Sequence, residues 1–260
     1  MAGLSTHVDD HVLTLTLDRP ARMNCIDGAL ADALEAAWTR FHQDDDLRVA
    51  ILTGAGQEAF CSGADLDAVD ELGPGGHATE AEREAFLQDG TGYLGGTRFT
   101  HIDKPILAAI NGHCLAGGLE LACLADLRIA EAHATFGVTC RRWNVPLVDG
   151  GTQRLPRIVG LGHAMDLILT GRTIEAQEAH RMGLVNEIVE PGQALPRCRE
   201  IAELLAQHPQ EAMRADKASV LQGLGRPRAE GRALAARGGE AVITSQAFRD
   251  GIARFSQRER

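Results

Sequence analysis

The chain has 260 residues, 44% of them apolar and 24% charged, which is the composition of a globular protein that can bury a large core. Its 26 basic and 36 acidic residues give a net charge of −10, which argues against nucleic-acid binding because phosphate recognition needs a basic face. No apolar run approaches the ~18 residues that cross a bilayer, and the amino-terminal residues lack the pattern of a secretory signal, so we expect a cytoplasmic protein with no membrane partner.

The first 60 residues predict two strands and a helix. Leucine alternates with threonine over residues 11–17, which is typical of a half-buried strand. A helix is expected after Asp27, a suitable N-cap, because apolar residues recur at helical spacing from Leu30 to Phe41. The short apolar run at 49–52 indicates a buried strand, and a turn follows at 53–56.

Residues 70–98 have a different character. Glycine-rich stretches flank a charged segment with weak helical periodicity. Two interpretations stay open: a mobile segment that covers part of a site, or a plain excursion over the surface.

Strands and helices alternate again from residue 105 onward. The pattern predicts a buried strand at 105–110, a helix at 117–124 and a short strand at 127–130. Beyond residue 161 the chain reads as mostly helical, with Thr173 as the N-cap and Gly183 as the glycine that ends a helix over 174–182. We therefore expect an α/β fold, divided into a core over 1–200 and a C-terminal helical region over 201–260.

Two glycine-containing turns each follow a buried strand. They read F-C-S-G-A-D-L at 60–66 and N-G-H-C-L-A-G-G-L-E-L at 111–121. Glycine at the start of a helix lets a ligand approach the free N–H groups of the first turn. Two such donors aimed at one oxygen would form an oxyanion hole, whereas tight packing of a helix on a strand is the alternative explanation.

These turns belong to a longer series of motifs that resembles the crotonase superfamily, the enoyl-CoA hydratase/isomerase family. The matching segments include L-D-R-P-A-R-M-N at 17–24, A-F-C-S-G-A-D-L at 59–66, K-P-I-L-A-A-I-N-G-H-C-L-A-G-G-L-E-L at 104–121 and G-G-T-Q-R-L-P-R-I-V-G at 150–160. The resemblance covers nearly the whole chain.

The resemblance implies a spiral of strand–strand–helix turns and a C-terminal helical region that forms homotrimers or hexamers. It implies an acyl-CoA thioester as substrate, with coenzyme A as part of that substrate and no separate cofactor. The backbone N–H groups at the positions of Ala64 and Gly117 would bind the thioester oxygen. The residues assigned to the substrate and coenzyme A are Arg22, Ser62, Ala64, Asp65, Leu66, Gly117 and Cys140.

One carboxylate is placed for proton transfer. Glu120 follows Gly117 by three residues, a spacing that puts both on one helix face. It matches the first of the two glutamates of the hydratase pattern. Glu120 is therefore the predicted principal acid–base residue.

The second hydratase glutamate is missing. Its position in the resemblance is taken by Cys140, and a thiol is a poor replacement for a carboxylate. Asp149 is the one new carboxylate nearby: it could act as an acid or base, or it could cap the helix that starts at Gly150. Arg141 and Arg142 could pair with Asp149, bind a polar acyl group, or be solvated.

Three functions remain open on this evidence. The chain could be an enoyl-CoA hydratase of fatty-acid or related acyl-CoA catabolism, a double-bond isomerase that needs one carboxylate, or an acyl-CoA-binding homologue with little catalysis. A cysteine version of the hydrolase elbow at 112–116 is discounted because Ala116 breaks its pattern. The six cysteines form no C-x-x-C pair and no metal-ligand spacing appears, so we expect free thiols and no metal.

Overall fold

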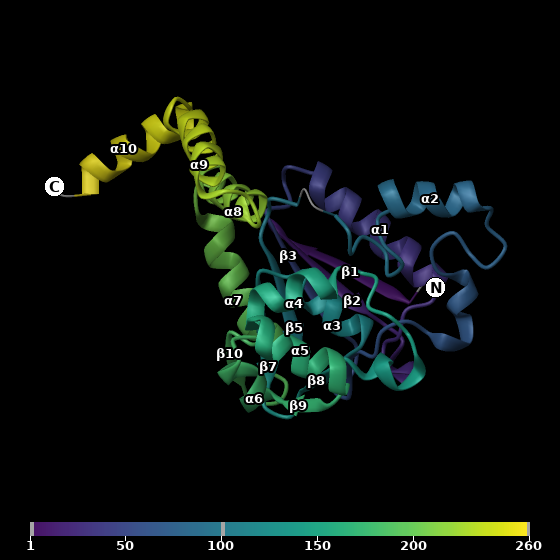
Figure 1. Cartoon of the computed structure of the whole chain (residues 1–260). Helices are drawn as coiled ribbons and strands as arrows, with labels where there is room; N and C mark the ends of the chain where they lie inside the picture. The colour runs from purple at the N-terminus through teal and green to yellow at the C-terminus, as the bar shows by residue number, and fades with distance from the viewer. Residues whose placement is uncertain (1–2, 100–101, 259–260) are drawn as a thin grey trace.

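The computed structural model describes residues 3–99 and 102–258 and contains two sheets connected by helices (Figure 1). The larger sheet has the order β1-β2-β3-β5-β7-β10, and the smaller has the order β4-β6-β8-β9. All neighbouring strands are parallel except the pairs β1–β2 and β8–β9. The larger sheet is built from Leu4–Asp9, Val12–Leu17, Val49–Gly54, Ile106–Ile110, Leu127–Glu131 and Glu187–Val189. The smaller sheet is built from Ala59–Cys61, His113–Leu115, Thr135–Gly137 and Thr173–Glu175.

From β3 to β8, successive strands alternate between the two sheets, so the chain advances as a spiral of strand–strand–helix turns. β3 is followed by β4 of the smaller sheet, β5 by β6, and β7 by β8. This arrangement confirms the predicted α/β class and the spiral architecture. Its consequence is that β4 and β6, which end in the two glycine-containing turns, pair with each other.

The helices are α1 (Gly28–Gln43), α2 (Glu80–Asp89), α3 (Gly117–Ala122), α4 (Gly151–Val159), α5 (Leu161–Thr170), α6 (Ala176–Arg181), α7 (Ala194–Gln207), α8 (Gln210–Gly223), α9 (Arg228–Ile243) and α10 (Gln246–Arg258). Short 3-10 helices occupy Pro20–Arg22, Leu66–Glu71 and Thr139–Trp143. Among the described residues, no helix is long and apolar enough to cross a membrane.

Apolar side chains fill two layers on opposite faces of the larger sheet. One layer lies between the sheets and includes the α1 residues expected from the sequence: Leu30, Leu34, Trp38 and Phe41. Asp27 caps α1 by accepting a hydrogen bond from the Leu30 N–H at 2.9 Å, as predicted. The other layer is covered by α7, whose small residues Ala194, Cys198 and Ala202 pack against the strands.

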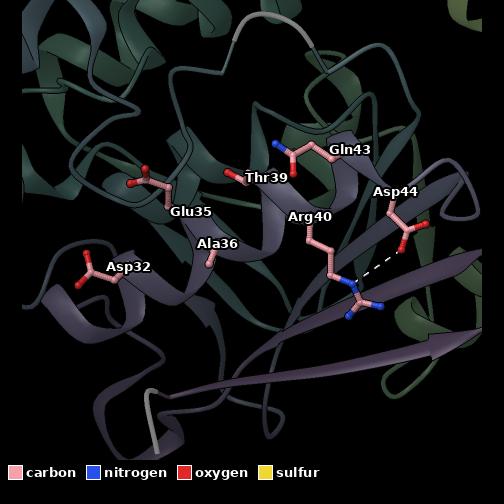
Figure 2. Close-up of a pocket in the computed structure, with 7 residues that line it drawn as sticks. All are labelled: Asp32, Glu35, Ala36, Thr39, Arg40, Gln43 and Asp44. Atoms are coloured by element: carbon pink, nitrogen blue, oxygen red, sulfur yellow. Dashed lines mark ion pairs between the residues drawn. The ribbon is translucent and has the colours of Figure 1, made fainter.

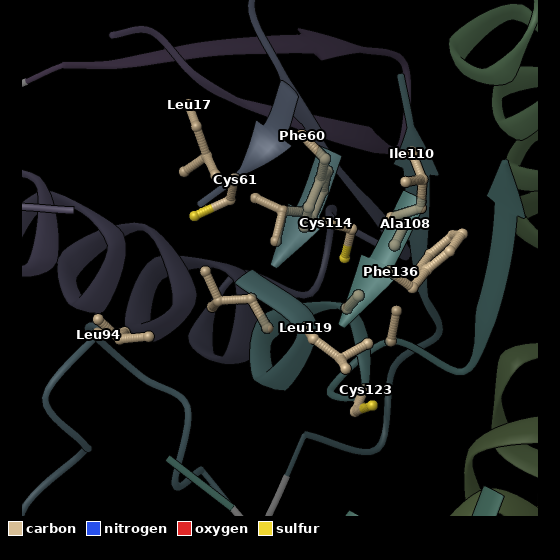
Figure 3. Packing of buried hydrophobic residues seen from close by; sticks show 14 of the residues in the cluster. Leu17, Phe60, Cys61, Leu94, Ala108, Ile110, Cys114, Leu119, Cys123 and Phe136 are labelled. Carbon is tan, nitrogen blue, oxygen red and sulfur yellow. The ribbon is translucent and has the colours of Figure 1, made fainter. Parts of the chain in front are cut away.

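Helix α3 lies against the strands of the smaller sheet, in the interior. Leu119 and Cys123 point into the same apolar cluster as Cys61 and Cys114, while Leu94 approaches from the loop side (Figure 3). A Cβ on Gly118 would lie 2.7 Å from the carbonyl carbon of Cys61, so only glycine lets the helix approach the strand this closely.

One sequence expectation about local structure is corrected, and a neighbouring one is confirmed. Thr173 does not cap a helix: it begins β9, which pairs with β8, and the helix that follows starts at Ala176. Strand pairing therefore outweighs the capping preference of threonine at this position. Gly183 follows the end of that helix with φ +80°, as predicted for a terminating glycine.

Residues 70–98 are not a plain loop. They contain α2, whose N-terminus is closed by a capping box between Thr79 and Glu82. The end of the segment turns inward, where Leu94 and Thr97 are buried. The interpretation that this segment covers part of the site therefore receives structural support, because Leu94 lies next to Gly117.

Candidate active site

The two glycine-containing turns meet at the start of α3. A Cβ on Gly63 would lie 2.8 Å from the Gly117 nitrogen, and a Cβ on Gly117 would lie 3.6 Å from the Ala64 nitrogen. In the part of the chain that the structure describes, neither the Ala64 nor the Gly117 N–H has a hydrogen-bond acceptor. The structure thus brings together two free backbone donors, which is the requirement for an oxyanion hole.

Ala116 fixes the direction of the second donor. Its backbone has φ +51° and ψ −122°, a conformation that favours glycine and costs an alanine about 1–3 kcal/mol. Its N–H donates to the Gly137 carbonyl at 2.8 Å, and its own carbonyl accepts from the Leu119 N–H at 3.0 Å. The strained residue is held from both sides, so the peptide that carries the Gly117 N–H has one orientation.

Glu120 lies one turn further along α3, and its carboxylate is bound by backbone rather than by a cation. Its Oε1 accepts hydrogen bonds from the N–H of Gly151 at 2.8 Å and of Asp149 at 3.0 Å. The residue is 3% exposed. Burial, opposed by the Gly151 hydrogen bond, raises the pKa of Glu120 to about 7, which suits a group that both accepts and returns protons near neutral pH.

Asp149 does not cap a helix, so that interpretation is wrong. Helix α4 begins at Gly151 with Gly150 as its N-cap, and no side chain bonds to this cap. The Asp149 carboxylate instead accepts from the Leu94 N–H at 3.2 Å and from the Thr97 hydroxyl. Asp149 therefore ties the loop at 92–97 to the segment whose backbone holds Glu120, and burial raises the pKa of its carboxyl.

Arg141 and Arg142 do not pair with Asp149. They donate instead to carbonyls of Ile168 and Gly171 near the end of α5, at 3.2 Å and 3.4 Å. Both arginines are exposed.

Cys140 lies in the short helix before Asn144 and is buried. Burial raises the pKa of its thiol, although the Arg141 charge opposes the shift. Cys140 is therefore neutral at physiological pH and cannot serve as a second carboxylate.

Five of the seven residues predicted to bind the substrate and coenzyme A line one hollow of 360 Å³, whereas Gly117 and Cys140 do not line it. Its walls are formed by Ala21, Arg22, Met23, Cys25, Ser62, Ala64, Asp65, Leu66 and Asp67. Arg22 is half-exposed and pairs with Asp65 at 2.7 Å and with Asp67 at 2.5 Å. Burial opposes ionisation of Asp65, yet the hydrogen bonds from Arg22 and Arg19 lower its pKa to about 2. Arg22 thus lines the same hollow as Ala64, one of the two residues with a free N–H.

A second hollow lies on the outer face of α1 and contains none of the predicted site residues. It measures 690 Å³ and is lined by Asp32, Glu35, Ala36, Thr39, Arg40, Gln43 and Asp44 (Figure 2). Its walls come from the exposed side of one helix, with an ion pair between Arg40 and Asp44 at 3.9 Å. Its lining residues include neither the two free backbone N–H donors nor a buried carboxylate, so we assign the candidate active site to the start of α3.

Sequence reasoning did not anticipate the partners that hold the site together. Thr97 and Leu94 lie more than 50 residues from Asp149, and Arg154 donates to the backbone oxygens of both Asp149 and Thr97. No motif links these positions along the chain. Among the described residues, no group of three or more His, Cys, Asp or Glu side chains could hold a metal ion.

Comparison with known proteins gives a consistent result. Residues 7–260 match the family model described as enoyl-CoA hydratase/isomerase. The chain is 38% identical over 226 residues to (E)-benzylidenesuccinyl-CoA hydratase of Thauera aromatica, covering 86% of this chain and 84% of that protein. It is 36% identical over 219 residues to crotonyl-CoA hydratase of Syntrophomonas wolfei, covering 83% and 80%. The crystal structure of enoyl-CoA hydratase from Mycobacterium tuberculosis superimposes with a TM-score of 0.88 at 32% identity, covering 99% and 97% of the two chains.

Proposed function

The chain belongs to the enoyl-CoA hydratase/isomerase family, and on that premise we propose that it adds water across the double bond of a 2-enoyl-CoA, with Glu120 moving the protons. Membership makes it an enzyme that acts on acyl-CoA thioesters, as a hydratase or an isomerase. The observation that carries the proposal is the buried Glu120 carboxylate, one turn after the free Gly117 N–H and with a pKa raised to about 7.

The reaction needs one carboxylate and the two backbone donors. Ionised Glu120 takes a proton from water while the water oxygen bonds to Cβ of the substrate. The electron pair of the double bond moves to the thioester oxygen, where the N–H groups of Ala64 and Gly117 stabilise the negative charge. The protonated Glu120 then delivers a proton to Cα, and the thioester carbonyl re-forms.

Asp149 is a positioning residue in this scheme. Its backbone N–H holds Glu120, and its side chain holds the loop that carries Leu94 over Gly117. Arg22, Ser62, Asp65 and Leu66 would receive the coenzyme A part of the substrate, in the hollow that leads to Ala64. Cys140 would form part of the site wall as a neutral, apolar group.

A second candidate function is double-bond isomerisation. It is favoured by Cys140, because moving a double bond requires one group that removes a proton and returns it to another carbon, with no second carboxylate. Glu120 could perform both steps on a 3-enoyl-CoA.

Steady-state assays of the purified protein with crotonyl-CoA and with a 3-enoyl-CoA test the proposal. We expect loss of the conjugated-thioester absorbance of crotonyl-CoA as water adds. If the conjugated-thioester absorbance instead appears from the 3-enoyl-CoA while crotonyl-CoA stays unchanged, the protein is an isomerase and not a hydratase. If neither substrate reacts but an acyl-CoA still binds, the protein is an acyl-CoA-binding homologue without catalysis.

The C-terminal helices support an oligomeric enzyme. Helices α9 and α10 extend away from the body of the protein (Figure 1), and Phe248, Ile252 and Phe255 on α10 are exposed. We place these apolar side chains against neighbouring copies in a homotrimer or hexamer, which light scattering at micromolar concentration checks. The proposed cytoplasmic location is supported by the six cysteines, which are unpaired as in proteins of a reducing compartment.

A further inference from the structure

A cavity of 910 Å³ lies at the C-terminal end of α3, where it is lined by residues of α4 and α8 together with Phe99 and Ile102. It begins one turn after Glu120, at Cys123, and its wall includes Gly150 and Arg154. Gly150 stands between the two residues whose N–H groups bind Glu120. The cavity therefore adjoins the segment whose backbone holds Glu120, and it shares no lining residue with the coenzyme A hollow.

The walls of this cavity are strongly cationic, although the chain as a whole carries a net charge of −10. The charged side chains that line it are Arg98, Arg128, Arg154, Arg157, Lys217 and Arg226, with Asp126 as the one acidic residue. Asp126 is engaged by Lys217 at 2.7 Å. Within residues 3–99 and 102–258, four of the arginines have no carboxylate within 4.0 Å: Arg98, Arg128, Arg154 and Arg157.

These arginines are held by neutral carbonyls instead. Arg98 donates to the Val148 carbonyl at 3.2 Å, and Arg154 donates to the Asp149 carbonyl at 2.9 Å. Burial lowers the pKa of Arg154, which means that the cation lacks full compensation. An anion in the cavity would supply this compensation through charge-assisted hydrogen bonds.

Apolar residues supply the remaining wall. They are Phe99, Ile102, Ile158, Leu221 and Leu224. The combination of carbon surface and arginine suits an aliphatic chain that ends in a negative charge, and it does not favour a small inorganic ion.

We propose that this cavity binds the far end of the acyl group and selects acyl-CoA thioesters that carry a carboxylate there. The inference rests on the proposed function, since it names the substrate class of the same site. Gly117 and Cys123 are separated by a rise of about 9 Å along α3, and acyl groups of six carbons, which extend over a comparable length, are chosen for the test.

The test compares two pairs of thioesters that differ only in the terminal group. Hex-2-enedioyl-CoA and hex-2-enoyl-CoA measure turnover, and the unreactive adipyl-CoA and hexanoyl-CoA measure binding by calorimetry. We expect the wild type to favour the carboxylate-bearing member of each pair by roughly tenfold or more, as a charged hydrogen bond implies.

Arg157→Gln and Arg98→Gln should reduce that preference by about tenfold, and they should change hex-2-enoyl-CoA turnover by much less because this substrate lacks the carboxylate. Arg199→Gln is the matched control, because Arg199 is exposed on α7 and does not line the cavity. Equal affinity of the wild type for adipyl-CoA and hexanoyl-CoA would overturn the inference. So would variants that weaken both thioesters equally and change the mass in light scattering, because the arginines would then serve a contact between copies.

Failure of the proposed function gives a different result. In that case neither unsaturated thioester would react, whereas the binding preference for adipyl-CoA would persist and still support the cavity assignment. Turnover of hex-2-enoyl-CoA with no preference for the carboxylate-bearing thioesters would support the proposed function and contradict the cavity assignment.

Discussion

Glu120→Gln is expected to lower kcat by about 10²–10⁴ while the affinity for an acyl-CoA thioester is retained. Glutamine keeps the side-chain shape, and its amide oxygen can still accept the N–H groups of Asp149 and Gly151. It cannot take or return a proton. Steady-state kinetics, with calorimetric binding of hexanoyl-CoA, separate the two effects.

Asp149→Asn is the comparison variant. Its oxygen can still accept from the Leu94 N–H and the Thr97 hydroxyl, so we expect a much smaller loss than for Glu120→Gln. If Asp149→Asn abolished activity and Glu120→Gln preserved it, the roles of the two residues would be reversed.

The pH dependence of the wild type supplies a signature of Glu120. Activity requires the ionised carboxylate, so kcat/KM should rise as pH increases through about 7. Stability should follow the opposite trend. The pKa of Glu120 is higher in the folded protein than in the unfolded chain, so its contribution is fully present below pH 4.5 and is lost as pH rises through about 7. Glu120→Gln should remove this contribution.

Gly118→Ala is expected to cost about 3 kcal/mol of stability and most of the activity. The added methyl group would collide with the backbone carbonyl of Cys61, at 2.7 Å from its carbon atom, and backbone cannot yield as a flexible side chain does. Helix α3 would have to move away from β4, which displaces the Gly117 N–H from the Ala64 N–H. A displacement of about 1 Å at a reacting centre can cost 10² in rate.

Gly162→Ala on α5 provides the matched control for this substitution. A Cβ on Gly162 meets nothing within 4 Å, and glycine inside a helix is less stable than alanine by roughly 0.5–1 kcal/mol. We expect Gly162→Ala to be neutral or stabilising with full activity. Equal thermal unfolding temperatures and equal kcat for the two variants would contradict the assignment of close packing to Gly118.

Local features of the site were predictable from the sequence, because short-range interactions set them. The cap at Asp27, the glycine at 183 and the start of α3 at Gly117 each depend on neighbours within one turn. The pairing of Glu120 with Gly117 on one face follows from helix geometry alone.

The features that sequence reasoning missed depend on contacts between distant segments. Asp149 looked like a cap because it precedes a helix, yet its acceptors are used by Leu94 and Thr97, which the fold brings from another turn of the spiral. Thr173 resembled a cap for the same reason, until pairing with β8 placed it in a strand. The strain at Ala116 has no sequence signal, because alanine rarely adopts its backbone angles.

The central claim is that the Ala64 and Gly117 donors stabilise a thioester enolate whose proton is moved by Glu120. Exchange of the Cα hydrogens of butyryl-CoA in deuterium oxide, followed by mass spectrometry, tests it most directly, because this exchange needs the enolate and neither hydration nor isomerisation. We predict that the wild type incorporates deuterium at Cα and that Glu120→Gln slows incorporation by about 10² or more. Bound butyryl-CoA that gains no deuterium with the wild type, or gains it equally fast with the variant, would contradict the claim.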